Sequence, residues 1–307
     1  MILIQILLLA LGFAMLVKGA DWFVEGTSGI ARKLGIPQLV VGLTIVAMGT
    51  SAPEAAVSIT AALKGNAAIT IGNVVGSNIL NILIILGITG VLTTVSVQLS
   101  TMKYEIPYMI FITLVLIIMG FTDAYITFTE GIILWFLFLL YLLYLFFLAK
   151  NGAEEKSLAE KGYPRLLISA IAGGIIVVWG SDVTVDSATQ IATMLGLSER
   201  FIGLTIVALG TSLPELFTSV TAARHGNADI AIGNIVGSNI FNILFVIGTT
   251  GLITPVIFEP AFLIDSVIAV LAGVLLWISV IRTKSLRRPW GIIMLAGYAG
   301  YFIYLLL

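Results

Sequence analysis

Two glutamates stand out because each is the only charged residue in a long apolar stretch. Glu54 lies in GLTIVAMGTSAPEAAVSITAAL, and Glu215 lies in the similar stretch GLTIVALGTSLPELFTSVTAA. A carboxylate in sequence apolar enough to cross a membrane is costly to bury and by default indicates function. Because carboxylate oxygens attract cations, both glutamates are candidate ligands for a metal ion.

Both glutamates belong to a sequence that occurs twice. Residues 42–88 and 203–249 are identical at 31 of 47 positions, without a gap and at a constant offset of 161 residues. The correspondence continues outside this segment, since Asp21 and Asp182 are also 161 residues apart. Equivalent carboxylates in two repeats predict one cation site shared between the two halves of the chain.

Each glutamate follows a motif that interrupts a helix. Pro53 removes a backbone hydrogen bond and clashes with the preceding turn, so the helix is expected to break and to free carbonyls from Ala47 onward. Thr50 and Ser51 precede Glu54 by four and three residues, which places these oxygens near one face. Such oxygens suit hard cations. The second copy repeats the arrangement with Ala208, Thr211, Ser212 and Pro214.

A second motif supplies neutral oxygens. Ser77 and Asn81 are four residues apart, on one helix face, in GNVVGSNILN. Gly72 and Gly76 form a small-residue pair that lets membrane helices approach closely. The matching ligand candidates are Ser238 and Asn242. The other asparagines of these two motifs, Asn73, Asn78, Asn234 and Asn239, are expected to brace neighbouring helices instead of contacting ions.

The composition indicates an all-α polytopic membrane protein. Hydrophobic residues make up 59% of the 307 residues and charged residues only 10%, far fewer than in soluble domains. There is no cysteine and one histidine, which excludes thiol chemistry and a two-histidine zinc site. The net charge of −1 gives no indication of nucleic-acid binding. We expect no enzyme activity and no cofactor, because no nucleophile and base pair accompanies the repeats.

Apolar stretches long enough to span a bilayer predict ten transmembrane helices. Their approximate limits are 3–31, 39–63, 67–92, 104–120, 126–149, 164–193, 201–223, 228–252, 261–281 and 289–307. Residues 1–149 and 163–307 then form halves of five helices each, joined by a polar linker at 150–162. Because five is odd, the second half enters from the opposite side, which makes the two repeats inverted in topology.

Basic residues predict the orientation, since they favour the cytoplasmic side. In the ten-helix layout only Lys64 and Arg200 fall on the side opposite the linker. The linker side carries Arg32, Lys33, Lys103, Lys150, Lys156, Lys161, Arg165, Arg224, Arg282, Lys284, Arg287 and Arg288. The linker is therefore expected to be cytoplasmic and both termini extracellular, in an integral protein of the plasma membrane.

The motifs GTSAPE and GNVVGSNILN, repeated as GTSLPE and GNIVGSNIFN, resemble the alpha-repeats of sodium/calcium exchangers. The resemblance implies that Glu54 and Glu215 bind Ca²⁺ and Na⁺ in competition, and that the carbonyls of Ala47 and Ala208 serve sodium sites. It implies further ligands at Thr50, Ser51, Ser77, Asn81, Thr211, Ser212, Ser238 and Asn242. Potassium-dependent members usually have aspartate where this chain has Asn242, so Asn242 favours a potassium-independent exchanger.

The expected activity is therefore antiport of sodium against calcium by alternating access, with Na⁺, Ca²⁺ and the lipid bilayer as partners. Proton/calcium exchange is an alternative, because two adjacent carboxylates can take up protons. A cation channel or uniporter is a second alternative. The oligomeric state is left open, although a monomer contains a full set of ligands.

Overall fold

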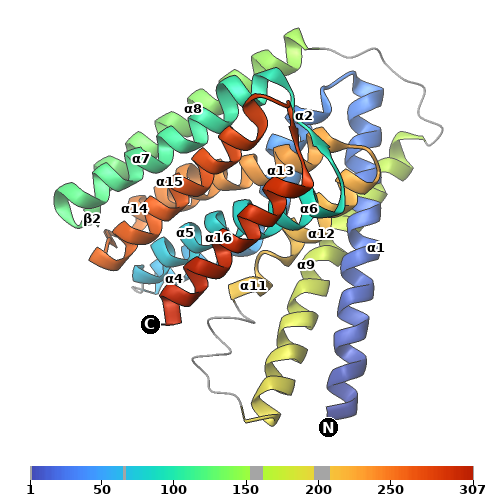
Figure 1. The fold of residues 1–307 in the computed structure, drawn as a ribbon, viewed down its shortest axis with the longest axis horizontal. Coiled ribbons are helices and arrows are strands. Elements are labelled where there is room, and N and C mark those ends of the chain that lie inside the picture. Colours follow the sequence, from blue (N-terminus) through green and yellow to red (C-terminus); the bar gives the residue numbers. More distant parts are fainter. Residues whose placement is uncertain (1, 65–66, 153–161, 197–207, 307) are drawn as a thin grey trace.

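The computed structural model describes residues 2–64, 67–152, 162–196 and 208–306, most of which are helical (Figure 1). The first half contains α1 (Ile2–Leu34), α2 (Gln38–Val41), η1 (Gly42–Val46), α3 (Ala47–Thr50), α4 (Ala52–Leu63), α5 (Ala68–Leu80), η2 (Asn81–Leu86), α6 (Gly87–Leu92), β1 (Val95–Ser96), η3 (Thr101–Glu105), α7 (Ile106–Asp123), β2 (Tyr125–Ile126) and α8 (Phe128–Asn151). The elements labelled η are π-helical turns.

The second half repeats this order. It contains α9 (Tyr163–Met194), α11 (Ala208–Gly210), α12 (Leu213–Arg224), α13 (Ala228–Phe241), η5 (Asn242–Ile247), α14 (Gly248–Ile253), β3 (Val256–Ile257), α15 (Pro260–Ile281), β4 (Ser285–Leu286) and α16 (Arg288–Leu306). Residues 153–161 of the predicted linker and 201–207 of the seventh predicted helix lie outside the described residues.

Helical elements cover part of each of the ten predicted segments. Among the described residues, seven helices are long and apolar enough to cross a membrane, or eight if the bent pair Gln38–Thr50 and Ala52–Leu63 is counted as one span. The helical, membrane-spanning character is thus confirmed, while the exact layout of ten spans stays a prediction.

Local sequence explains where the helices begin. At α8, Thr127 and Glu130 form a capping box, in which the Thr127 backbone N–H donates to Glu130 Oε2 at 2.7 Å. Prolines occupy the first turn of α4, α9, α12 and α15, where the missing N–H needs no partner. The apolar run that follows in each case then continues the helix.

Elements from the two halves alternate in space. Strand β1 pairs with β4 of the other half, and β2 pairs with β3, both antiparallel. Helix α8 packs against α14 and α16 packs against α6, with Gly131 and Gly291 at the closest contacts. The last long helix of each half, α8 or α16, therefore packs against the other half.

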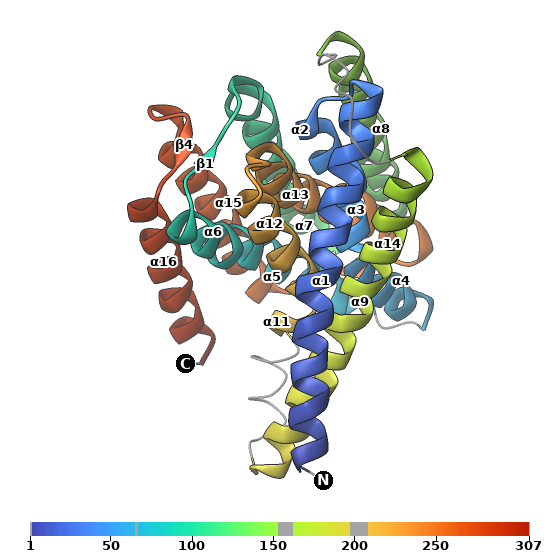
Figure 2. The ribbon, with the colours of Figure 1, turned by 90° about the vertical axis from the view of Figure 1, so that its right-hand side faces the viewer.

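Helices α1 and α9 lie side by side along most of their length and extend beyond the remaining elements (Figure 2). Glycines permit this contact. A Cβ atom built at Gly26 would lie 2.4 Å from the backbone nitrogen of Ala170, and one at Gly173 would lie 2.4 Å from that of Phe23. The two helices therefore pack backbone against backbone at these glycines.

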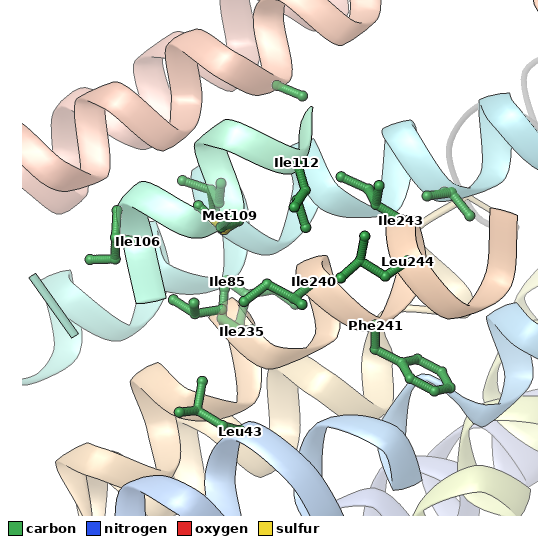
Figure 3. Close-up of a cluster of buried hydrophobic side chains, with 14 of the residues drawn as sticks. Leu43, Ile85, Ile106, Met109, Ile112, Ile235, Ile240, Phe241, Ile243 and Leu244 are labelled. Atoms are coloured by element: carbon green, nitrogen blue, oxygen red, sulfur yellow. The ribbon is translucent and has the colours of Figure 1, made fainter. Parts of the chain in front are cut away.

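The buried core surrounds the repeated segments. Figure 3 shows Leu43 of η1, Ile85 of η2, Ile106 of α7 and Ile240 of α13 within one apolar cluster. Helix α13 belongs to the most enclosed of the membrane-spanning helices that the structure describes, since every residue from Ile230 to Phe241 is buried. The cluster therefore fixes α13 and the turns that carry the candidate ligands.

Gly237 provides a test of this packing. A Cβ atom there would lie 2.8 Å from Leu43 Cα and Leu43 O, so Gly237→Ala forces η1 and α13 apart. We expect the substitution to lower the free energy of unfolding by roughly 1–3 kcal/mol, measured by thermal denaturation in detergent. Gly300→Ala in α16 is the matched control, because no described atom lies within 4 Å of its Cβ position. Equal stability of both variants would contradict the packing described.

Candidate cation site

Both predicted helix breaks are present. Helix α3 ends at Thr50 and α4 begins at Ala52, with a bend of 49° between the joined segments. In the second half, α11 ends at Gly210 and α12 begins at Leu213. The residues between them have nearly the same conformation, with φ −83° and ψ 6° at Ser51 and φ −89° and ψ 3° at Ser212. The same sequence therefore produces the same break twice.

The carbonyl of Ala47 is not freed by the break, and that expectation is wrong. Ala47 O accepts the backbone N–H of Ser51 at 3.0 Å and lies 3.3 Å from Ser238 Oγ. The physical reason is the register of the helix. Pro53 lacks the N–H that would reach Gly49, so the carbonyl two residues earlier keeps its partner. Ala208 is the first residue of α11.

The two glutamates are completely buried at the first turns of α4 and α12. Ser77 Oγ donates to Glu54 Oε1 at 3.3 Å, and Ser51 Oγ donates to Glu215 Oε1 at 2.8 Å. The expected grouping of Ser51 with Glu54 is thus replaced by a contact with the other half. Ser51 directly precedes the helix that carries Glu54, so its contact with Glu215 brings the two glutamates to one interface between the halves.

Hydroxyl groups link the two halves around the carboxylates. Ser77 Oγ lies 3.3 Å from Ser212 Oγ, and Thr50 Oγ1 lies 3.0 Å from Asn234 Oδ1. Both serines and Thr50 are buried, whereas Thr211 is only half-buried in the turn after α11. The structure therefore brings Thr50, Ser77 and Ser212 into the network, and places Thr211 at its edge.

Two asparagines brace the helices that carry the glutamates, as expected. Asn73 Nδ2 donates to the Glu54 carbonyl at 3.3 Å and to Ser58 Oγ at 3.0 Å. The second half repeats these contacts: Asn234 Nδ2 is 3.4 Å from the Glu215 carbonyl and 2.9 Å from Ser219 Oγ. The sequence analysis missed both serines, although they match at the 161-residue offset.

Asn81 and Asn242 each begin a π-helical turn, η2 and η5. Single π-helical turns within α-helices are frequent at functional sites, because the extra residue re-aims the side chains around it. Both side chains are completely buried. The Asn81 amide nitrogen donates to Asn239 Oδ1, and that of Asn242 donates to Asn78 Oδ1.

Among the candidate ligands, four buried carboxylate and amide oxygens lack a hydrogen-bond donor within the described part of the chain. They are Glu54 Oε2, Glu215 Oε2, Asn81 Oδ1 and Asn242 Oδ1, two pairs related by the 161-residue offset. A buried acceptor without a partner is costly, and an ionised carboxylate even more so. Carboxylate and amide oxygens are the ligands that hard cations prefer. The residues present therefore fit a cation substrate.

The acidic groups alone do not make a metal centre. No cluster of three or more His, Cys, Asp or Glu side chains suited to a metal ion occurs in residues 2–64, 67–152, 162–196 and 208–306. A bound cation would depend on neutral oxygens for the rest of its coordination. This requirement matches the serine, threonine and asparagine side chains of the two motifs.

Glu105 is a buried carboxylate outside this network that the sequence analysis passed over. It is 1% exposed in η3, where Tyr144 of α8 donates a hydrogen bond to it. The sequence does indicate this residue, because Glu105 is the only charged residue in the predicted span 104–120. Its second oxygen also lacks a donor among the described residues, which makes Glu105 a matched control for Glu54 and Glu215.

Broken helices from two repeats, with buried carboxylates at the breaks, are typical of membrane proteins that transport ions. A family model described as "Sodium/calcium exchanger protein" matches residues 4–147 and 165–307. The chain therefore belongs to the sodium/calcium exchanger family. It is an integral membrane protein that exchanges cations for calcium and is not an enzyme.

Individual relatives cover nearly the whole chain. The sodium/calcium exchanger MaX1 of Methanosarcina acetivorans is 31% identical over 347 residues, covering 99% of each protein. The inner membrane protein YrbG of Escherichia coli is 34% identical over 307 residues, covering 95% of this chain and 93% of YrbG. A solved structure of the sodium-calcium exchanger NCX_Mj superposes with a TM-score of 0.87 at 31% identity, covering 99% of this chain and 100% of NCX_Mj.

Calcium is expected to stabilise the purified protein by occupying the four oxygens. At a Ca²⁺ concentration of about 100 times Kd, the free energy of unfolding should rise by about 2.7 kcal/mol, which thermal denaturation in detergent measures. Glu54→Gln and Glu215→Gln should lose most of this increase, while Glu105→Gln should retain it. An increase that is the same in all three variants would place the calcium elsewhere.

Proposed function

We propose that the chain exchanges Na⁺ for Ca²⁺ by alternating access at the site between the two helix breaks. The observation that carries this proposal is the set of four candidate-ligand oxygens, two from each half, that are buried without a donor among the residues the structure describes. A protein that keeps such oxygens in its interior is suited to a cation that arrives and leaves. Cation/calcium exchange is the activity of the family, and the identity of the counter-ion is the point proposed.

The charge of the site supports exchange between a divalent and a monovalent cation. Ionised Glu54 and Glu215 give the site a charge of −2, which one Ca²⁺ balances. Sodium achieves the same balance only with more ions, so the two substrates compete for the same oxygens. An empty site leaves two buried carboxylates uncompensated, which disfavours crossing without an ion.

Further ligands follow from the positions of the polar side chains. We assign hydroxyl oxygens as further cation ligands. They belong to Ser51, Ser77, Ser212 and Ser238, and to Thr50 and Thr211 at the two breaks. Asn81 and Asn242 contribute amide oxygens. The carbonyls of Ala47 and Ala208 are assigned to sodium, which at Ala47 requires the hydroxyls of Ser238 and Thr50, each 3.3 Å from the carbonyl oxygen, to turn away.

The relatives support sodium as the counter-ion. MaX1 is named a sodium/calcium exchanger, and crystals of NCX_Mj were soaked with Na⁺ and Ca²⁺. Asn242 in place of an aspartate keeps the site charge at −2 and favours independence from potassium. We therefore extend sodium-coupled exchange to this chain.

Alternating access needs two related halves. We propose that residues 1–149 and 163–307 are inverted repeats of five helices, with 150–162 as a cytoplasmic linker and both termini outside the cell membrane. The reciprocal pairing of β1 with β4 and of β2 with β3 supports a two-fold relation between them. One copy of the chain supplies both halves of the site, so a monomer suffices.

Calcium uptake into proteoliposomes tests the proposal. Vesicles loaded with Na⁺ and diluted into sodium-free medium should accumulate radioactive calcium, and dissipating the sodium gradient should stop uptake. Uptake driven by a pH gradient and indifferent to sodium would identify a proton/calcium exchanger. Uptake that needs no counter-ion at all would identify a channel or uniporter. Either result would overturn the proposed coupling.

Charge removal tests the site in the same assay. Glu54→Gln or Glu215→Gln leaves the remaining carboxylate to bind calcium alone, which should cost roughly 3–5 kcal/mol, or more than about 100-fold in calcium affinity. Glu105→Gln should transport at the wild-type rate, since it lies outside the network. Normal uptake by either site variant would contradict the assignment.

A further inference from the structure

Asn78 and Asn239 form a reciprocal pair where the two halves meet. Asn78 Nδ2 donates to the backbone carbonyl of Asn239 at 3.2 Å, and Asn239 Nδ2 donates to the carbonyl of Asn78 at 3.1 Å. The residues are 161 positions apart and both are buried. A contact that is the same from both sides is the signature of a two-fold axis.

These two bonds fix the orientation of both amide groups. A backbone carbonyl can only accept a hydrogen bond, so each side chain must turn its NH₂ group toward it. The amide oxygen of each residue then points the other way. Oxygen and nitrogen are otherwise hard to distinguish in a side-chain amide, and here the carbonyls decide between them.

The freed amide oxygens in turn orient the candidate ligands. Asn239 Oδ1 accepts from Asn81 Nδ2 at 2.9 Å, and Asn78 Oδ1 accepts from Asn242 Nδ2 at 3.2 Å. If either ligand amide were flipped, two oxygens would face each other at this distance inside a buried network. The NH₂ groups of Asn81 and Asn242 are therefore held, and their oxygens are the groups left without a donor within the described chain.

We propose that Asn78 and Asn239 are positioning residues that keep the amide oxygens of Asn242 and Asn81 turned toward the cation. Each half orients the ligand of the other half, because Asn78 holds Asn242 and Asn239 holds Asn81. The arrangement also restricts which side chain can stand at positions 81 and 242. The group that faces the amide oxygen of Asn239 or Asn78 must donate a hydrogen bond, which favours asparagine over an ionised aspartate. The site therefore keeps two carboxylates. The inference rests on the proposed function in one respect, that these oxygens bind Ca²⁺.

A double-mutant cycle separates this role from a structural one. Asn239→Leu keeps the size of the side chain but frees the amide of Asn81 to rotate and present its NH₂ group to the cation. We expect calcium affinity, measured by titration calorimetry on the purified protein, to fall roughly 10- to 100-fold, as for other residues that orient a metal ligand. In an Asn81→Ala background the same substitution should change affinity by only about twofold, because the amide it orients is gone. Asn78→Leu with Asn242→Ala is the mirror cycle.

Trp277→Phe is the matched control. It removes a hydrogen bond of 2.8 Å between Trp277 Nε1 and the Met102 carbonyl, which joins two helices away from the site. Calcium affinity should not change in this variant, even if its thermal stability falls. If Asn239→Leu binds calcium like the wild type, or weakens binding equally with and without Asn81, the positioning role is wrong.

The proposed function and the positioning role fail in different ways. If the wild type does not bind calcium, or if Glu54→Gln binds it normally, the site itself is wrong. If Glu54→Gln abolishes binding while the cycle shows no coupling, only the positioning role is wrong. Should the leucine variants not fold, solid-state NMR on wild-type protein with labelled asparagine decides. A close contact from Asn242 Nδ2 to Asn78 Cγ is expected, and its absence would overturn the orientation.

Discussion

The structure depends on two carboxylates enclosed where water and lipid do not reach them. Glu54 and Glu215 are fully buried, and each has one oxygen bonded to a serine and one oxygen without a donor among the described residues. Charges in such surroundings repel each other strongly and need a counter-charge from within the site. The surrounding helices, breaks and amides can be understood as the frame that holds this arrangement open to a cation.

The frame is built from contacts that cross between the halves. Ser51 of the first half donates to Glu215 of the second, and Asn242 of the second half donates to Asn78 of the first. Strand pairing and the packing of α8 on α14 and α16 on α6 follow the same rule. A displacement of one half against the other would therefore change several ligands at once. This coupling of ligand geometry to the relative position of the halves is what exchange by alternating access requires.

Local features of the site could be predicted from the sequence, because they depend on residues close together in the chain. The breaks follow from Pro53 and Pro214, and the bracing role of Asn73 follows from its place beside the ligand candidates. Contacts between the halves could not be predicted in the same way. The pairing of Ser51 with Glu215 depends on how two similar motifs meet, which neither motif encodes alone. The Ala47 carbonyl is a different case, because the position of Pro53 already indicates that the carbonyl of Gly49, and not that of Ala47, loses its helical partner.

Locating calcium in the protein is the decisive test of a cation site shared by the two repeats. A crystal grown with Ca²⁺ and measured at a wavelength where calcium scatters anomalously should show one peak bounded by both halves. Glu54 Oε2, Glu215 Oε2 and the amide oxygens of Asn81 and Asn242 should lie about 2.3–2.6 Å from it, the usual Ca²⁺–oxygen distance. A peak that contacts only one of the two glutamates, or one that lies outside the interface of the repeats, would contradict the account.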